Sequence, residues 1–204
     1  MKKRLVALIT ILLLVASLSL STFAANGFNK AVFENATDVY TVRDDMTGDL
    51  LATSESLLGD KGIAIPETGG GYVKVYFGAS ISDSMNMTSF VIKYYANDWA
   101  FIDNVIVKIG NKRYTFSNTN VTRDVLRDAT IKEDVGIEIT SKSMQMMTDL
   151  IEHRDGEVKV RLQGGNRDVD FVLTDDMKNG IINIWNLYVA GGGTSKASME
   201  KVDM

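Results

Sequence analysis

The amino-acid sequence predicts a mainly β protein of the α+β class, an antiparallel β-sandwich or strongly curved sheet of about eight strands with two late helices. Three observations predict this fold. Apolar and polar residues alternate from residue 26 onward, two short turns set apolar residues opposite each other, and helical spacing appears only after residue 140. Because 45% of the 204 residues are hydrophobic, we expect a packed core rather than a disordered chain.

Residues 1–24 predict an export signal. Residues 2–4 are basic, an apolar stretch runs to Leu20, and small residues precede Ala24 as a cleavage site requires. The apolar stretch is shorter than the roughly 20 residues of a spanning helix, although an uncleaved membrane anchor is the alternative. We therefore expect a secreted, periplasmic or cell-envelope bacterial protein with no stable membrane anchor after cleavage near Ala25.

The composition excludes several kinds of site. The chain has no cysteine and one histidine, His153, so disulfides, thiol nucleophiles and multi-histidine metal sites are impossible. Three of the 22 basic residues and none of the 26 acidic ones lie in residues 1–24, so the mature chain would carry 19 basic and 26 acidic residues, a net charge of −7. An acidic chain without a basic cluster predicts no nucleic-acid partner, and we expect no cofactor.

Residues 25–71 predict an N-terminal hairpin followed by a glycine-rich loop. Short strands over residues 38–43 and 49–53 flank a turn-rich connection. Residues 54–71 contain Pro66 and several glycines, including three in succession at the end, so they predict an irregular loop.

Residues 72–190 predict the main β domain. The first strand has an apolar face of Val73, Val75 and Phe77 and a wetter face of Tyr72, Lys74 and Tyr76. A second strand alternates in the same way, with Phe90, Ile92 and Tyr94 on one face and Val91, Lys93 and Tyr95 on the other. Asn97 and Asp98 then predict a tight reversal, and Asp103, in an apolar register, predicts a β-bulge.

Two-residue turns at residues 110–111 and 165–166 predict two hairpins whose register can be tested. The first turn sets Val107 opposite Tyr114 and Val105 opposite Phe116. The second sets apolar residues opposite each other at Leu162 and Val169, Val160 and Phe171, and Val158 and Leu173, with Arg161 opposite Asp170. Apolar residues face apolar ones in both hairpins, as half-buried antiparallel strands require.

Two helices are predicted late in the chain. Ser141 is the expected cap of the first, which carries Met144, Met147, Leu150 and Ile151 on one side and ends near His153. Thr174 is the expected cap of the second, which has Met177, Ile181, Ile184, Trp185 and Tyr188 at helical spacing. We expect Trp185 and Phe171 to be buried, and residues 191–204 to form a flexible tail.

Three features also carry a resemblance: residues 94–99 (YYANDW) before a hairpin, residues 160–164 (VRLQG), and the closing helix after Thr174. In the order and spacing of these features, residues 72–188 resemble uncharacterised domains of secreted proteins and lipoproteins of bacteria. The resemblance implies the fold described above and no activity, so it carries over no functional residues. Because the chain has no cysteine to lipidate, the resemblance implies free export.

The wetter strand faces give the candidate binding site, formed by Tyr72, Lys74, Tyr76, Lys93 and Tyr95. If the two strands are neighbours, three phenols and two ammonium groups form a platform suited to a glycan or a cell-surface protein. The alternative is ordinary sheet surface, or a face covered by one of the helices.

The remaining polar clusters have structural explanations, so we assign no catalytic or metal-binding residue. These clusters are His153 at a helix C-terminus, Asp44, Asp45 and Asp49 in a turn, Asp175 and Asp176 in a first helical turn, Asp168 and Asp170 on one hairpin face, and the methionines at 85, 87, 144, 146 and 147. The sequence therefore predicts a secreted non-enzymatic binding or structural domain. The alternative is a carboxylate-based glycan hydrolase, which needs only two carboxyl groups.

Overall fold

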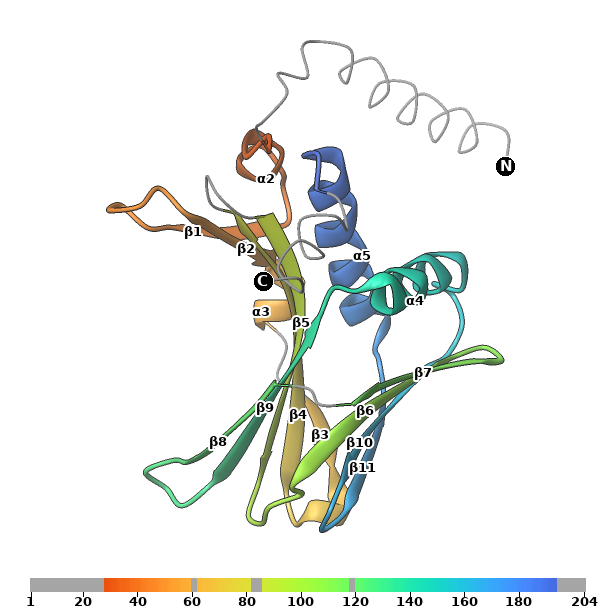
Figure 1. The fold of residues 1–204 in the computed structure, drawn as a ribbon. Helices are drawn as coiled ribbons and strands as arrows, with labels where there is room; N and C mark the ends of the chain where they lie inside the picture. The colour runs from red at the N-terminus through yellow and green to blue at the C-terminus, as the bar shows by residue number, and fades with distance from the viewer. Residues whose placement is uncertain (1–27, 60–61, 82–85, 118–119, 194–204) are drawn as a thin grey trace, which may run out of the picture.

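Two antiparallel sheets make up most of the protein, and this confirms the predicted fold class. The computed structural model describes residues 28–59, 62–81, 86–117 and 120–193 (Figure 1). The predicted export signal and residues 194–204 of the predicted tail lie outside the described residues. Among the described residues, no helix combines the length and the apolar character needed to cross a membrane.

The larger sheet has seven strands in the order β1-β2-β4-β5-β9-β8, and β3 pairs with the start of β4. Its strands are β1 (Val39–Arg43), β2 (Leu50–Ser54), β3 (Ile63–Ile65), β4 (Gly71–Ile81), β5 (Asn86–Ala96), β8 (Asn120–Val125) and β9 (Ile131–Glu138). The predicted N-terminal hairpin is β1–β2. It joins the same sheet as the predicted main domain, because β2 pairs directly with β4.

The smaller sheet has four strands in the order β11-β10-β6-β7. They are β6 (Ile102–Ile109), β7 (Lys112–Ser117), β10 (Val158–Gly164) and β11 (Asp168–Val172). Both predicted hairpin registers are confirmed, since Val107 lies opposite Tyr114 and Val160 opposite Phe171. The predicted bulge is also confirmed: Gln163 pairs with Asn104 and the next residue pairs with Ile102, which leaves Asp103 over.

The predicted reversal at Asn97 and Asp98 is not a hairpin turn. β5 and β6 lie in different sheets, and residues 97–101 carry the chain from one sheet to the other. The predicted loop over residues 54–71 is also more ordered than expected. It contains helix α3 (Glu55–Gly59), strand β3 and a 3-10 turn, η1 (Pro66–Thr68).

The described residues form eleven strands rather than about eight. Among those missed, β8 is an edge strand with mostly exposed side chains, so it has little apolar periodicity. In β9 the inward-facing series is interrupted by Glu133, a charged residue that the structure buries completely. A period-two search on apolar residues therefore passes over both strands.

Both predicted helices are present, as α4 (Ser141–Glu152) and α5 (Asp175–Ala190), and a short helix α2 (Ala31–Glu34) precedes β1. Thr174 caps α5 as predicted. The cap of α4 is Thr140 rather than Ser141, because Thr140 has the extended backbone of a cap and exchanges hydrogen bonds with Ser143.

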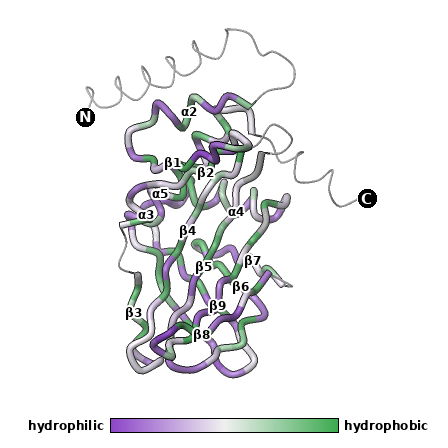
Figure 2. The backbone as a smooth tube through the Cα atoms, turned by 90° about the vertical axis from the view of Figure 1, so that its left-hand side faces the viewer, coloured by the Kyte–Doolittle hydropathy of each residue, from purple (hydrophilic) through white to green (hydrophobic). Residues whose placement is uncertain are grey.

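The core lies between the inner faces of the sheets, which approach each other at the lower end of Figure 1 and diverge at the upper end, where α4 and α5 lie. Hydrophobic and hydrophilic positions alternate along the larger sheet (Figure 2). Val73, Val75 and Phe77 are fully buried, as predicted, and Phe171 is buried too. Trp185 is only partly buried, contrary to expectation, because it lies at the margin of the buried stripe of α5.

Candidate functional site

The structure brings the five predicted site residues together on the outer face of the larger sheet. β4 and β5 are neighbours, as the prediction required. Tyr72 lies directly opposite Tyr95 and Lys74 directly opposite Lys93, and Tyr76 lies one position further along the same face of β4.

Tyr72 and Tyr95 stack on each other across the two strands. Their ring centroids are 4.6 Å apart and their planes are inclined by 15°. Burial raises the pKa of Tyr95 to about 12, with smaller contributions from Tyr76, Asp134 and Tyr72. The Tyr95 phenol is therefore protonated at neutral pH, so it can both donate and accept a hydrogen bond.

β9 extends this face with two charged residues that the sequence analysis missed. Asp134 lies opposite Lys93 and Lys132 lies opposite Tyr95. The Asp134 carboxylate is 3.2 Å from the Lys132 ammonium and 4.0 Å from that of Lys93, which also lies 5.1 Å from the centre of the Tyr76 ring. We call these seven residues the tyrosine–lysine face: Tyr72, Lys74, Tyr76, Lys93, Tyr95, Lys132 and Asp134.

Two polar groups on this face lack partners within the described part of the chain. The side chain of Lys74 makes no hydrogen bond or ion pair there, although it lies opposite a second lysine, Lys93. Like charges directly opposite each other on neighbouring strands are destabilising. The buried Oδ1 atom of Asp134 also has no hydrogen-bond partner among the described residues. The face therefore offers a hydrogen-bond donor and an acceptor that the described residues leave unused.

No described helix covers the tyrosine–lysine face. α5 packs against β2 and β4, and its Gly180 lies against Ser54. Ser54 is buried and shares the inward-facing parity of Leu50 and Ala52, so α5 lies on the inner side of the sheet. The five predicted site residues are half-buried.

The same outer face continues into an apolar region on the N-terminal hairpin. Tyr40, Val42 and Leu51 are 50%, 46% and 56% exposed. Tyr40 lies opposite Thr53, and Val42 lies opposite Leu51, which in turn lies opposite Ser80 on β4. Both strands were predicted. The sequence did not predict that these strands share the outer face of β4 and β5, because the pairing of β2 with β4 joins segments that are distant in sequence.

The carboxylates that a hydrolase would need gather in a second place, a polar cavity of about 480 Å³ between β3, η1 and β11. It is lined by Ile65, Glu67, Thr68, Asp98, Asn166, Arg167, Asp168, Val169 and Asp170. Asp98 forms a 2.9 Å ion pair with Arg167. Asp170 accepts two 2.6 Å hydrogen bonds from Arg161, and these lower the pKa of Asp170. Both side chains are thus held as ion-pair partners, and the lowered pKa of Asp170 is the opposite of what a general acid requires.

The other polar clusters take the structural roles predicted for them. The Asp44 carboxylate accepts hydrogen bonds from the backbone N–H groups of Met46 and Thr47 in the β1–β2 turn. His153 is the C-terminal cap of α4. Met146 and Met147 are in the core, while Met85 and the Met87 side chain lie outside the described residues. Within the described ranges, no group of three or more acidic or histidine side chains is placed to hold a metal ion.

Comparison of the chain with protein-family models, with curated proteins and with solved structures finds no match. The resemblance of residues 72–188 to bacterial secreted domains therefore stays a prediction.

Proposed function

We propose that this protein is a non-enzymatic binding domain that takes a glycan through the tyrosine–lysine face. The observation that carries the proposal is the stacked pair Tyr72 and Tyr95 beside the lysines Lys74 and Lys93, on a sheet face that no described helix covers.

The chemistry of this face suits a sugar. Aromatic rings offer apolar surface to the C–H faces of a pyranose, and phenols and ammonium groups offer hydrogen bonds to its hydroxyls. The side chains come from adjacent strands of one sheet, so their positions are set before binding and little ordering is required of them.

A protein partner is the second candidate, and the apolar region of the same face favours it. Contiguous exposed apolar residues mark protein interaction sites, and Tyr40, Val42 and Leu51 are such a group. A carboxylate-based glycan hydrolase has less support, because Asp98 and Asp170 in the polar cavity are ion-paired with arginines.

The proposal includes export from a bacterial cell, which residues 1–24 and the absence of cysteine support. Intact-mass measurement of the exported protein should give a chain that begins near Ala25. A full-length chain recovered from the membrane fraction would contradict cleavage.

The triple variant Tyr72→Ser, Tyr76→Ser and Tyr95→Ser tests the binding face. On an array of neutral bacterial and plant glycans, we expect the wild type to be retained and the variant to lose retention, because aromatic side chains carry a large share of binding energy. Circular dichroism of the variant should match that of the wild type.

The matched control is the variant Tyr40→Ser, Val42→Ser and Leu51→Ser, at the other end of the same face. Unchanged glycan retention in this control would localise the glycan to the tyrosine–lysine face. The second candidate would replace the first under a different result. In that result the wild type crosslinks to a protein partner, the control variant no longer does so, and the tyrosine triple variant still does.

A further inference from the structure

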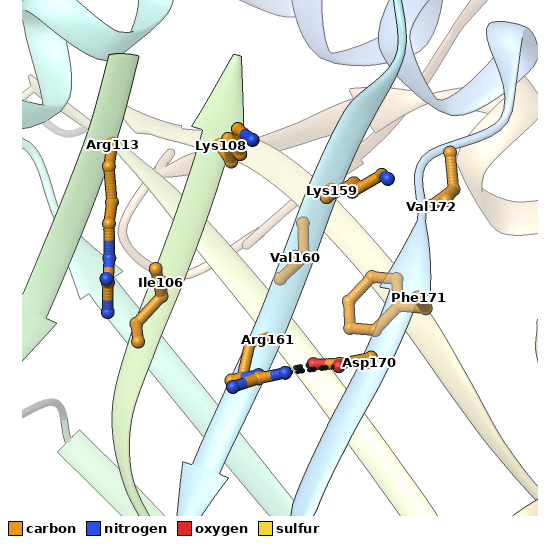
Figure 3. Close-up of a pocket in the computed structure, with 9 residues that line it drawn as sticks. All are labelled: Ile106, Lys108, Arg113, Lys159, Val160, Arg161, Asp170, Phe171 and Val172. Atoms are coloured by element: carbon orange, nitrogen blue, oxygen red, sulfur yellow. Dashed lines mark hydrogen bonds and ion pairs between the residues drawn. The ribbon is translucent and has the colours of Figure 1, made fainter. Parts of the chain in front are cut away.

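The outer face of the smaller sheet holds a second, separate feature, a shallow cavity of about 460 Å³ (Figure 3). It is lined by Ile106, Lys108, Arg113, Lys159, Val160, Arg161, Asp170, Phe171 and Val172. These residues come from all four strands of the smaller sheet, and none belongs to the tyrosine–lysine face.

Three cations form a row across this cavity. Lys159 of β10 lies directly opposite Lys108 of β6, and Lys108 lies directly opposite Arg113 of β7. Neighbouring strands are about 4.8 Å apart, so the backbone positions of the three residues lie within a span of roughly 10 Å, and all three side chains line the cavity. We call Lys159, Lys108 and Arg113 the cationic row.

The cationic row is costly for the fold, because like charges directly opposite each other destabilise a strand pair. The side chains of Lys108 and Arg113 make no hydrogen bond or ion pair with any described residue. Lys159 has a partner in Glu157, but both side chains of that pair are more than half exposed. This concentration of charge stands out in a chain whose net charge is −4.

Other side chains border the row. Arg161 is held by Asp170, so its charge is largely matched within the protein (Figure 3). Apolar surface lies at the floor and at one end of the row, from Ile106 and from Val172, which is 42% exposed. The surface thus combines unmatched positive charge with aliphatic contact area.

We propose that the cationic row binds a carboxylated polysaccharide of the uronate type. Such a chain carries one carboxylate per sugar ring. Its successive carboxylates can each accept a charge-assisted hydrogen bond from a cation on a successive strand. The C–H faces of its rings can pack on Ile106 and Val172. This inference is independent of the proposed function, since the two sites lie on different sheets.

An acidic peptide fits this surface less well. Peptides that bind sheets usually pair with an exposed edge strand through main-chain hydrogen bonds. The row runs across β10, β6 and β7, and the two lysines lie on β10 and β6, each of which is already paired on both sides within the sheet. A peptide lying over the two lysines would find no free main-chain partners, whereas a polysaccharide needs none.

The test uses the exported, processed protein and affinity electrophoresis in gels containing polygalacturonate, with neutral dextran gels as the reference. The double variant Lys108→Gln and Arg113→Gln removes the two unpaired charges. The matched control, Arg43→Gln and Arg127→Gln, makes the same change in net charge at two exposed positions of the larger sheet that lie outside the tyrosine–lysine face, on β1 and in the β8–β9 turn.

We expect polygalacturonate to retard the wild type and the control, and the double variant to bind roughly tenfold more weakly or worse. Retardation should weaken as salt is added, because exposed charges are screened. The double variant should unfold at the same temperature or higher, since a like-charge contact has been removed.

Three results would overturn the inference. The first is no retardation of the wild type by polygalacturonate. The second is an equal loss of retardation by polygalacturonate in the double variant and the control, which would show an effect of net charge alone. The third is binding of polyglutamate as tight as that of polygalacturonate, which would assign the row to acidic peptides. The tyrosine triple variant should keep its polygalacturonate binding, so failure of either proposal can be recognised separately.

Discussion

Arg123 and Glu133 face each other across β8 and β9, and their 3.0 Å ion pair holds the segment that joins the two sheets. Glu133 is completely buried and accepts hydrogen bonds of 2.7 to 2.9 Å from the backbone N–H groups of Ala100, Phe101 and Ile102. Arg123 also donates to the carbonyl of Ile102. Phe101 has a positive φ of 55°, which is unfavourable for a bulky residue and requires such support.

Replacing Glu133 with glutamine should strongly destabilise the protein. The glutamine amide places an NH₂ group where a carboxylate oxygen of Glu133 accepts a hydrogen bond, so at least one backbone N–H loses its partner. Arg123 also loses its counter-charge. We expect the free energy of unfolding, measured with urea, to fall by about 3–5 kcal/mol. The control Asp170→Asn breaks an exposed ion pair and should cost less than about 1 kcal/mol. Similar losses in the two variants would show that burial of Glu133 does not matter.

Asp149 should make stability depend on pH. This buried carboxylate joins α4 to β7 by accepting hydrogen bonds from Lys112, Tyr114 and Gln145. Burial alone would raise the pKa of Asp149, but these hydrogen bonds outweigh it and lower the pKa. A lowered folded-state pKa stabilises the protein above the unfolded value of about 3.9, and this stabilisation is lost as the pH falls through the folded value.

The variant Asp149→Asn measures that contribution. We expect it to be less stable than the wild type at pH 7, with a difference that shrinks as the pH falls below about 4. Urea unfolding at pH 7, 4 and 3 gives the comparison. A difference that stays constant over this range would mean that Asp149 is not ionised in the folded protein.

Gly180 should resist replacement although it lies inside a helix. Alanine there would raise helix propensity by roughly 1 kcal/mol. Its Cβ, however, would lie 2.7 Å from the Ser56 Oγ atom and 2.9 Å from the Leu57 Cγ atom. We expect Gly180→Ala to lower the free energy of unfolding by about 1–3 kcal/mol through overpacking. Gly59→Ala is the control, because nothing lies within 4 Å of its added Cβ. A stabilised Gly180→Ala variant would show that α5 can move away from α3.

Local features of the sequence were sufficient to predict the two hairpin registers and the faces of β4 and β5. Turn residues such as Gly110, with its positive φ of 55°, set which residues pair, and the period of two sets which side each residue takes. The five residues of the predicted site followed from that alternation alone. Asp134 did not, because Glu133 beside it hides the strand to which both belong.

Local periodicity and turn chemistry thus determined from sequence most of the strands, though not β3, β8 or β9, and which side chains of those strands share a face. The tertiary structure alone decided that β5 and β6 separate into two sheets, that Glu133 is buried beneath their junction, and that Lys159 meets Lys108. Such contacts join residues far apart in the chain. Their energies depend on burial and on partners that no local window of sequence contains.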